Sequence, residues 1–397
     1  MNADCLKLTI YFGERDRVGR RFLADALLDC YERHGLATSV LLRGIEGFGA
    51  KHRLKTQRLL TLSEDLPVVS VAVDTRQRID QVLPEVTALM GDGLITLERA
   101  TLVADELDEL VLPERLAEAT KLTVYLGRNE QTDGQPTFLA VVNLLHRHGV
   151  AGATVLLGVD GTAHGVRQRA RFFGGNAKVP LMIISVGAGD TIAHALPELE
   201  ALLERPLVTL ERIRVCKRDG RRLADPHPLP TDNLDGLGIW HKLMIYAGEE
   251  AEHHGHPLYL QLIRRLREAG AAGATCLRGI WGYHGDHQPH GDRLLTLRRK
   301  VPVLTVVVDR PDRIHRWYQI VDELTDQTGL VTSELVPAFR ATGPDLQEGG
   351  LHLSNPQPKS IAATEGRAPS AEMNRDEQFA RRQGWHRVAI DYFGSSG

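Results

Sequence analysis

Three stretches of the sequence decide the fold: LKLTIYFG from Leu6, TKLTVYLG from Thr120 and HKLMIYAG from His241. Counted from the lysine of each stretch, glycines follow after six, 28 and 37 residues, and a proline follows after 59 or 60. This register indicates three tandem copies of one unit, which we call repeats 1, 2 and 3. A unit of about 100 residues can bury its own core, so the repeats are domains and not the short units of a solenoid.

The hydrophobic periods inside a repeat alternate between strand and helix. In repeat 1 they predict strands over residues 7–12, 38–43, 68–73 and 94–102 and a helix over residues 77–90, while Leu258 to Ala269 carries the helical spacing of the first helix in repeat 3. The order β-α-β-β-α-β predicts an α+β, ferredoxin-like fold. Two helices cover one face of such a sheet, so the other face needs a partner. We therefore expect an intrachain pseudo-trimer that is monomeric in solution.

Composition shifts predict the domain boundaries. We expect domains over residues 1–104, 118–217 (the most divergent copy) and 239–343, joined by an acidic connector and by a linker with three prolines. Residues 344–397 are rich in Gly, Pro, Ser and Gln, which predicts a flexible tail.

The overall composition excludes several classes of protein. The net charge of −3 and an aromatic content of 5% argue against a protein that coats nucleic acid. No apolar run reaches the roughly 18 residues that span a bilayer, so we expect no membrane-embedded part. The four cysteines are widely separated and no signal peptide is visible, which favours a cytoplasmic protein.

The long loop after the second strand of each repeat concentrates positive charge. Residues 43–58 hold five basic side chains and one acid, and residues 278–300 hold five and two. Arginine holds anions bidentately and glycine lets backbone N–H groups approach them, so these loops predict an anion or nucleotide site. Basic, Gly-rich loops also serve solubility and turning, and that alternative stays open. The candidate ligand residues are Arg43, Gly44, Gly47, Phe48, Gly49, Arg58, Arg278, Gly279, Gly282 and Arg293.

Repeat 2 departs from this pattern. It has Leu157 where the other copies have Arg43 and Arg278, although it retains Arg167 farther along the loop. Leucine can neither donate a hydrogen bond nor neutralise a phosphate. We therefore expect fewer than three strong sites in the chain.

Two other functions remain as alternatives. Imidazole and carboxylate groups suit zinc, nickel or copper, so His284, His287 and His290 in the loop of repeat 3 are candidate metal ligands. A small phosphatase or other hydrolase is compatible with a ferredoxin-like scaffold, but no catalytic motif is recognisable, and we expect no enzyme. Cys30 and Cys276 fall within predicted elements, which is typical of buried, inert thiols.

A family resemblance rests on the string LRGIEGFGAKHRLKTQRLLTLSEDLPVVSVAVD, residues 42–74, and on LRGIWGYHG and VPVLTVVVD in repeat 3. These strings resemble the family catalogued as domain of unknown function 190, which is similar to PII-like signalling proteins. The resemblance implies a trimeric ferredoxin-like scaffold with ligand clefts between subunits and a mobile loop. It also implies a small anionic ligand such as an adenine nucleotide, no required cofactor, and a regulated enzyme or membrane transporter as partner.

Overall fold

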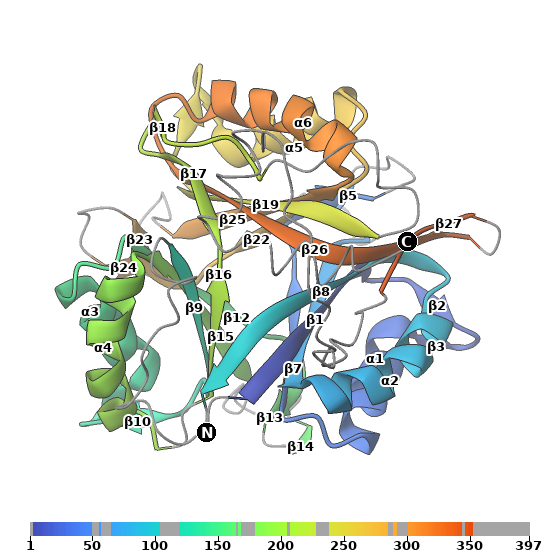
Figure 1. Cartoon of the computed structure of the whole chain (residues 1–397), viewed down its shortest axis with the longest axis horizontal. Helices are drawn as coiled ribbons and strands as arrows, with labels where there is room; N and C mark the ends of the chain where they lie inside the picture. The colour runs from blue at the N-terminus through green and yellow to red at the C-terminus, as the bar shows by residue number, and fades with distance from the viewer. Residues whose placement is uncertain are drawn as a thin grey trace, which may run out of the picture. The chain divides into compact units, whose positions relative to one another are not determined.

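Repeat 1 forms a four-stranded antiparallel sheet with two helices on one face (Figure 1). Its strands lie in the order β8-β1-β7-β4. The predicted strands and helices are observed, with no end more than four residues from its expected position. Their bounds are β1 Ala3–Gly13, α1 Leu23–Arg33, β4 Thr38–Arg43, β7 Pro67–Thr75, α2 Arg76–Leu89 and β8 Asp92–Val103.

Repeats 2 and 3 have the same element order and the same strand order, β16-β9-β15-β12 and β26-β19-β25-β22. Repeat 2 comprises β9 Thr120–Gly127, α3 Thr137–Arg147, β12 Gly152–Leu157, β15 Pro180–Gly187, α4 Gly189–Leu202, β16 Val208–Arg212 and β17 Arg214–Arg218. Repeat 3 comprises β19 Ile239–Gly248, α5 Leu258–Glu268, β22 Ala274–Arg278, β25 Pro302–Asp309, α6 Pro311–Leu324 and β26 Leu330–Thr342.

The structure is a computed structural model, in which residues 1–350 form one compact unit. The described residues are 3–49, 55–56, 65–103, 119–163, 166–167, 179–204, 207–227, 238–284, 289–291, 301–343 and 346–351. The connectors 104–118 and 228–237 and residues 352–397 of the predicted tail lie outside them. Leu346–Gly350, at the start of that tail, forms strand β27 and pairs with β26.

Short strands also lie in segments for which the sequence predicts loops. A hairpin precedes the first helix of each repeat: β2 Arg17–Val18 with β3 Arg21–Phe22, β10 Gln131–Thr132 with β11 Gln135–Pro136, and β20 Glu252–His253 with β21 His256–Pro257. The Gly-rich loop of each repeat contains a second pair: β5 Glu46–Phe48 with β6 Lys55–Thr56, β13 Asp160–Ala163 with β14 Val166–Arg167, and β23 Trp281–His284 with β24 His290–Gly291.

Strand pairs join the three repeats in a closed circuit. The loop strand of repeat 1 (β5) pairs with β22 of repeat 3, the loop strand of repeat 3 (β23) pairs with β12 of repeat 2, and that of repeat 2 (β13) pairs with β4 of repeat 1. The last strands close a second circuit through β8–β16, β17–β26 and β26–β8. One 21-stranded antiparallel sheet results, and Figure 1 shows its strands at the centre with the three helix pairs outside.

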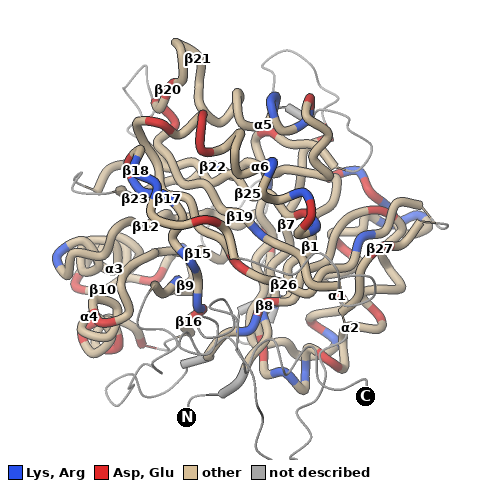
Figure 2. The backbone as a smooth tube through the Cα atoms, turned by 45° about the horizontal axis from the view of Figure 1, so that its top comes forward, with Lys and Arg blue, Asp and Glu red and all other residues tan. Residues whose placement is uncertain are grey.

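The centre of this arrangement is a hydrophobic core shared by all three repeats. It includes Val71, Met182 and Val306 from equivalent strands, and each of these side chains is at most 5% exposed. Figure 2 shows that the central strands are mostly uncharged along their length, while many charged positions lie on the helices and turns. The sheet faces without helices therefore bury one another, because no other surface covers them.

Six charged side chains interrupt the apolar surroundings, and we call them the central charge ring. Each lysine lies opposite a glutamate of its own repeat and also reaches a glutamate of another repeat, with Nζ–Oε distances from 2.6 to 3.5 Å. All six side chains are at most 6% exposed. The ring consists of Lys7, Lys121 and Lys242 with Glu98, Glu211 and Glu334.

Mutual attraction keeps most of the ring ionised. Burial opposes every charge, yet the neighbouring carboxylates raise the pKa of Lys7 and Lys242, and the lysines lower the pKa of Glu98 and Glu334. Lys121 differs, because burial outweighs its two carboxylates and lowers its pKa. With three charges of each sign the ring is electrically neutral, which makes its burial tolerable.

Repeat 3 contains a buried histidine whose imidazole makes no hydrogen bond to the described residues. His241 is 0% exposed at a position that Leu6 and Thr120 hold in the other repeats, and within the described part of the chain neither ring nitrogen has a hydrogen-bond partner. Burial, helped by His315, lowers the pKa of His241 to about 3. The imidazole of His241 is therefore uncharged at physiological pH.

Replacing His241 by leucine, as in repeat 1, is expected to raise the free energy of unfolding by roughly 1–2 kcal/mol at pH 7, since a buried unsatisfied polar group costs about 1–3 kcal/mol. Between the ordinary pKa of 6.5 and about 3, only the unfolded wild type binds the proton. As the pH falls through this range, the free energy of unfolding of the wild type therefore decreases by up to about 1.4 kcal/mol per pH unit. The variant has no histidine at this position and does not show this decrease. Urea titrations at pH 7 and pH 5 should show the advantage of the variant growing by about 2 kcal/mol. An equal difference at both pH values would contradict this.

Candidate functional site

The predicted glycines lie where one repeat meets the next. A side chain on Gly44 would lie 2.6 Å from Pro67 Cγ, and one on Gly279 would lie 2.8 Å from Pro302 Cγ. Their N–H groups donate to the carbonyls of these same prolines, both at 2.8 Å. Gly47 faces the backbone of β22, where a Cβ would lie 2.6 Å from the carbonyl oxygen of Ala274. The close approach of two backbones thus explains these glycines, and the N–H groups of Gly44 and Gly279 already have acceptors.

The two predicted arginine anchors each hold a glutamate that follows the first strand. Arg43 lies 2.9 Å from Glu14, and Arg278 donates to Glu249 at 2.5 Å. Repeat 2 has lost both partners, because Leu157 and Arg128 stand at these two positions. An anion at either arginine would have to compete with this carboxylate, which the sequence analysis did not anticipate.

The residue after the second loop glycine enters the neighbouring repeat. Phe48 packs in the helix-side core of repeat 3, and Tyr283 packs in that of repeat 2, where its hydroxyl donates to the carbonyl of Val150 at 3.0 Å. Thr162 of repeat 2 instead forms a 2.9 Å hydrogen bond with Ser39 of repeat 1. The loop is therefore one of two connections between neighbouring repeats, beside the pairing of their last strands.

A cavity of about 290 Å³ lies beside this connection, between repeats 1 and 3. Repeat 1 contributes the end of β1, the loop residues Phe48 and Gly49 and the start of β8. Repeat 3 contributes residues 272–275 before and in β22, together with Val306, Val308 and Arg340. Of the predicted ligand residues, Phe48 and Gly49 line this cavity, whereas Arg43 and Arg278 lie outside its described lining.

The charge of the described lining differs from the predicted positive site. Three carboxylates, those of Asp16, Asp65 and Asp92, face one guanidinium, that of Arg340. Asp16 accepts a hydrogen bond from the N–H of Gly13 at 2.7 Å, and Asp65 accepts one from the N–H of Arg15 at 2.9 Å. The side of the cavity nearest repeat 1 is thus rich in acceptors, and the cationic group comes from repeat 3.

Arg340 is the one described cation that lines the cavity. Its side chain is 11% exposed, lies over the ring of Trp240 at 4.6 Å and is 3.7 Å from Glu348. Burial lowers the pKa of Arg340, which the carboxylates of Asp309 and Glu348 only partly offset. A second anion beside this guanidinium would be stabilising, because a partly desolvated charge gains most from an opposite charge.

The equivalent position between repeats 3 and 2 is almost filled. It is lined by Ala151–Thr154 of repeat 2 and by Tyr246–Gly248 of repeat 3, and its volume is only about 30 Å³. His284 lines it at the position that Gly49 holds in the larger cavity. A side chain on Gly49 would meet no described atom within 4 Å, so the glycine leaves space that histidine occupies in the other cleft.

Arg167 adds a cluster of ion pairs to the contact between repeats 2 and 1. Its guanidinium reaches Asp160 of its own repeat at 2.9 Å and, in helix α1 of repeat 1, Asp25 at 3.0 Å and Asp29 at 2.5 Å. Three carboxylates therefore already surround the arginine that repeat 2 retains.

Several predicted residues cannot be placed in the site. Arg58, Arg293 and His287 lie outside the described residues. His290 and His284 both line the small cavity, and His290 pairs with Gly282 across β23 and β24. The loop histidines are not among the groups of potential metal ligands found in the described part of the chain. No helix among the described residues is long and apolar enough to cross a membrane.

Comparisons with known proteins find one family domain three times along the chain. The family DUF190, described as "Uncharacterized ACR", matches residues 5–102, 119–215 and 240–338. A UPF0166 protein of Aquifex aeolicus is 32% identical over 92 residues, which are 23% of this chain and 86% of that protein. A UPF0166 protein of Methanocaldococcus jannaschii is 30% identical over 105 residues, which are 26% and 95% of the two chains.

Among solved structures, an aspartate kinase from Synechocystis aligns with a TM-score of only 0.22 and 10% identity, covering 84% of this chain and 43% of the kinase. Each UPF0166 relative spans about one repeat, so the present chain carries in one polypeptide three copies of what those proteins contain once. The chain belongs to the DUF190 family, with three tandem copies of the family domain.

Proposed function

We propose that this chain is a PII-like regulatory protein. Its three repeats act as ferredoxin-like domains of an intrachain pseudo-trimer and bind a small anionic ligand, such as an adenine nucleotide, between repeats. The strand order shared by the three sheets and the closed circuit of strand pairs support the pseudo-trimer. Ligand binding would alter the surface that the loops offer to a regulated enzyme or transporter.

The cavity between repeats 1 and 3 is the observation that carries this proposal. Its volume of about 290 Å³ is close to the lower end of the usual range for ligand pockets, about 300–1,000 Å³. Tyr11, Phe12 and Phe48 offer apolar surface for a base, the carboxylates can accept hydrogen bonds from amino or hydroxyl groups, and Arg340 can hold an anionic group. A ligand with donors at one end and an anionic group at the other fits this lining.

Calorimetric titration of the full chain with ATP, ADP and AMP, at stated salt, is expected to give one site per chain and not three. The reason is the tenfold difference in volume between the two described cavities. Gly49→His, which imitates repeat 3, should weaken binding at least tenfold, because the imidazole fills the cavity. His284→Gly, which imitates repeat 1, should leave this site unchanged and can open a second one.

Three results would count against the proposal. Three equal sites would mean that the cavity volumes do not govern binding. Binding unaffected by Gly49→His would place the ligand elsewhere. A ligand of the folded state raises its apparent stability. If neither the three nucleotides nor a dicarboxylate gave heat or a thermal shift, the chain would instead be a scaffold that joins other proteins.

A further inference from the structure

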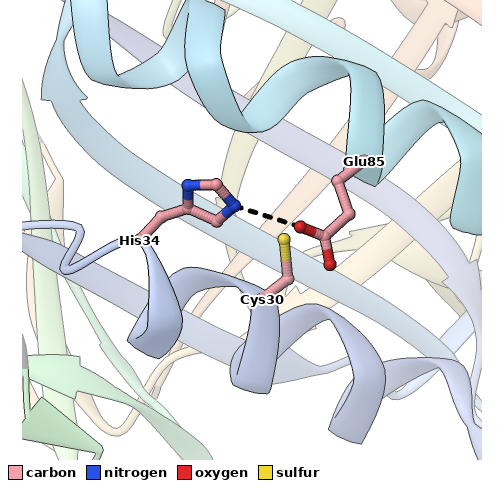
Figure 3. A group of neighbouring side chains, drawn as sticks. All are labelled: Cys30, His34 and Glu85. Atoms are coloured by element: carbon pink, nitrogen blue, oxygen red, sulfur yellow. Dashed lines mark hydrogen bonds and ion pairs between the residues drawn. The ribbon is translucent and has the colours of Figure 1, made fainter.

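Two groups of three side chains hold potential metal-ligating atoms within 4.8 Å of one another in the described part of the chain. One consists of the glutamates of the central charge ring, where three ammonium groups already neutralise the carboxylates. The other consists of Cys30, His34 and Glu85 on the two helices of repeat 1 (Figure 3). None of these three residues lines the cavity described above.

The second group joins two side chains that lie one helical turn apart, at the end of α1, with one side chain from α2. Cys30 lies in α1 and His34 is the residue that caps its C-terminal end, so the two are four residues apart and share one face of the helix. Glu85 extends from α2, and its Oε2 lies 3.0 Å from Nε2 of His34. Figure 3 shows the thiol and the imidazole converging on this carboxylate.

We propose that Cys30, His34 and Glu85 bind a divalent transition-metal ion of the zinc type, with water as the fourth ligand. Sulfur, imidazole nitrogen and carboxylate oxygen are the three donors that zinc accepts in proteins, and three protein ligands leave one position open. The His34 and Glu85 side chains are 33% and 38% exposed, while Cys30 is 0% exposed. The ion would therefore enter from the side of His34 and Glu85 and meet the thiol last.

The protonation states of the metal-free site are compatible with this order of binding. Burial, together with Glu85, raises the pKa of Cys30 to about 12, so the free thiol keeps its proton. On binding, the S–H bond breaks, the proton leaves to solvent and a sulfur–metal bond forms, as a coordinating cation deprotonates a thiol outright. The hydrogen bond from His34 lowers the pKa of Glu85, which is already a carboxylate. One thiolate and one carboxylate then offset the charge of the ion. Glu85 offers Oε2 to the metal while its Oε1 stays paired with the guanidinium of Arg33.

The other repeats supply natural controls. Repeat 2 keeps the ion pairs of this helix pair, with His148 and Arg147 at 3.0 and 3.2 Å from Glu198, but has Leu144 where Cys30 stands. Repeat 3 has Arg265 at the thiol position and Ala269 at the imidazole position. The recurring His–Glu pair by itself is explained by helix packing, and only repeat 1 adds the third donor.

Titration of the metal-free full chain with Co²⁺ alone tests the site, because a cobalt–thiolate bond gives a charge-transfer absorption in the near ultraviolet. We expect one equivalent, with the band removed by added Zn²⁺. Cys30→Ser should abolish the band and weaken binding at least about 10- to 100-fold, since even residues that only orient ligands cost that much. Leu144→Cys should add a second equivalent of the same band by completing a site around His148 and Glu198.

A thermal melt provides a second measurement that does not depend on cobalt spectroscopy. Zn²⁺ should raise the melting temperature of the wild type but not of Cys30→Ser, whose own melting temperature without metal reports whether it folds. A band that survives Cys30→Ser, or a zinc-dependent shift of equal size in that variant, would overturn the proposal and direct attention to the loop histidines of repeat 3. Absence of any band in the wild type would overturn it as well.

Discussion

Replacing Lys121 by methionine is expected to lower the free energy of unfolding by about 3–5 kcal/mol, because it leaves two buried carboxylates with one cation fewer. Lys121 is the most buried member of the central charge ring, with a side chain that is 0% exposed and lies 2.7 Å from both Glu211 and Glu334. Methionine is unbranched like lysine and similar to it in volume, although one atom shorter, so lost charge and not lost volume causes most of the effect. Urea titration monitored by circular dichroism measures it.

Two controls test whether the loss of stability depends on the central charge ring or follows from the removal of any charge. Arg147→Met removes an ion pair in the same repeat whose arginine is 65% exposed, and it should cost at most about 1 kcal/mol. Adding Glu334→Gln to Lys121→Met restores neutrality, so the double variant should lose less than the sum of the two single losses. A loss for Lys121→Met no larger than that for Arg147→Met would show that the ring charges are solvated.

The ring also shows what could be predicted from the sequence and what could not. The period of two in LKLTIYFG places Leu6, Leu8 and Ile10 on the face that packs under the helices. Lys7 falls on the other face, where a lysine is normally solvated. A lysine at the same position of three apolar strands, and a glutamate at the same position of three last strands, was the available signal. Only the lysines serve to align the repeats, and the pairing of lysine with glutamate between repeats depends on tertiary contacts that the sequence does not show.

The elements were predictable for a different reason. Strands such as 38–43 and helices such as 77–90 are specified by local hydrophobic periods, which the three copies repeat independently. The β2–β3 hairpin and the strand β5 were missed because they are two or three residues long. The pairing of β5 with β22 also joins residues more than 200 positions apart in the sequence.

The candidate site illustrates the ambiguity of a glycine. Gly44 and Gly47 are predicted as donors for an anion, whereas a neighbouring strand and a proline ring occupy the space beside them. Both uses require a residue without Cβ, so the residue type alone does not separate them. Gly49 is the exception among the three loop glycines of repeat 1, because it borders the cavity.

Gly161→Ala is the substitution that separates these two uses most clearly, and we expect it to destabilise the chain by about 3 kcal/mol or more. A Cβ at Gly161 would lie far inside the van der Waals radius of the Ser39 carbonyl oxygen in β4 and 2.7 Å from Pro180 Cγ. Neither neighbour can yield easily, since one is strand backbone and the other a proline ring. Urea titration should show the loss, and hydrogen exchange should show faster exchange of the amide of Val159, which donates to the carbonyl of Leu41 across the same contact.

Gly49→Ala is the matched control, because it changes a glycine of the equivalent loop in repeat 1 where a Cβ meets no described atom within 4 Å. It should alter stability by no more than about 0.5 kcal/mol, as surface substitutions usually do. If both variants were equally stable, the strands β13 and β4 could accommodate an extra methyl group. The closed circuit of repeats would then not depend on the close approach at Gly161. If only Gly161→Ala is destabilised, the loop glycines of β13 and its equivalents serve primarily to let one repeat lie against the next. The open position at Gly49 then remains as the part of the motif that is available to a ligand.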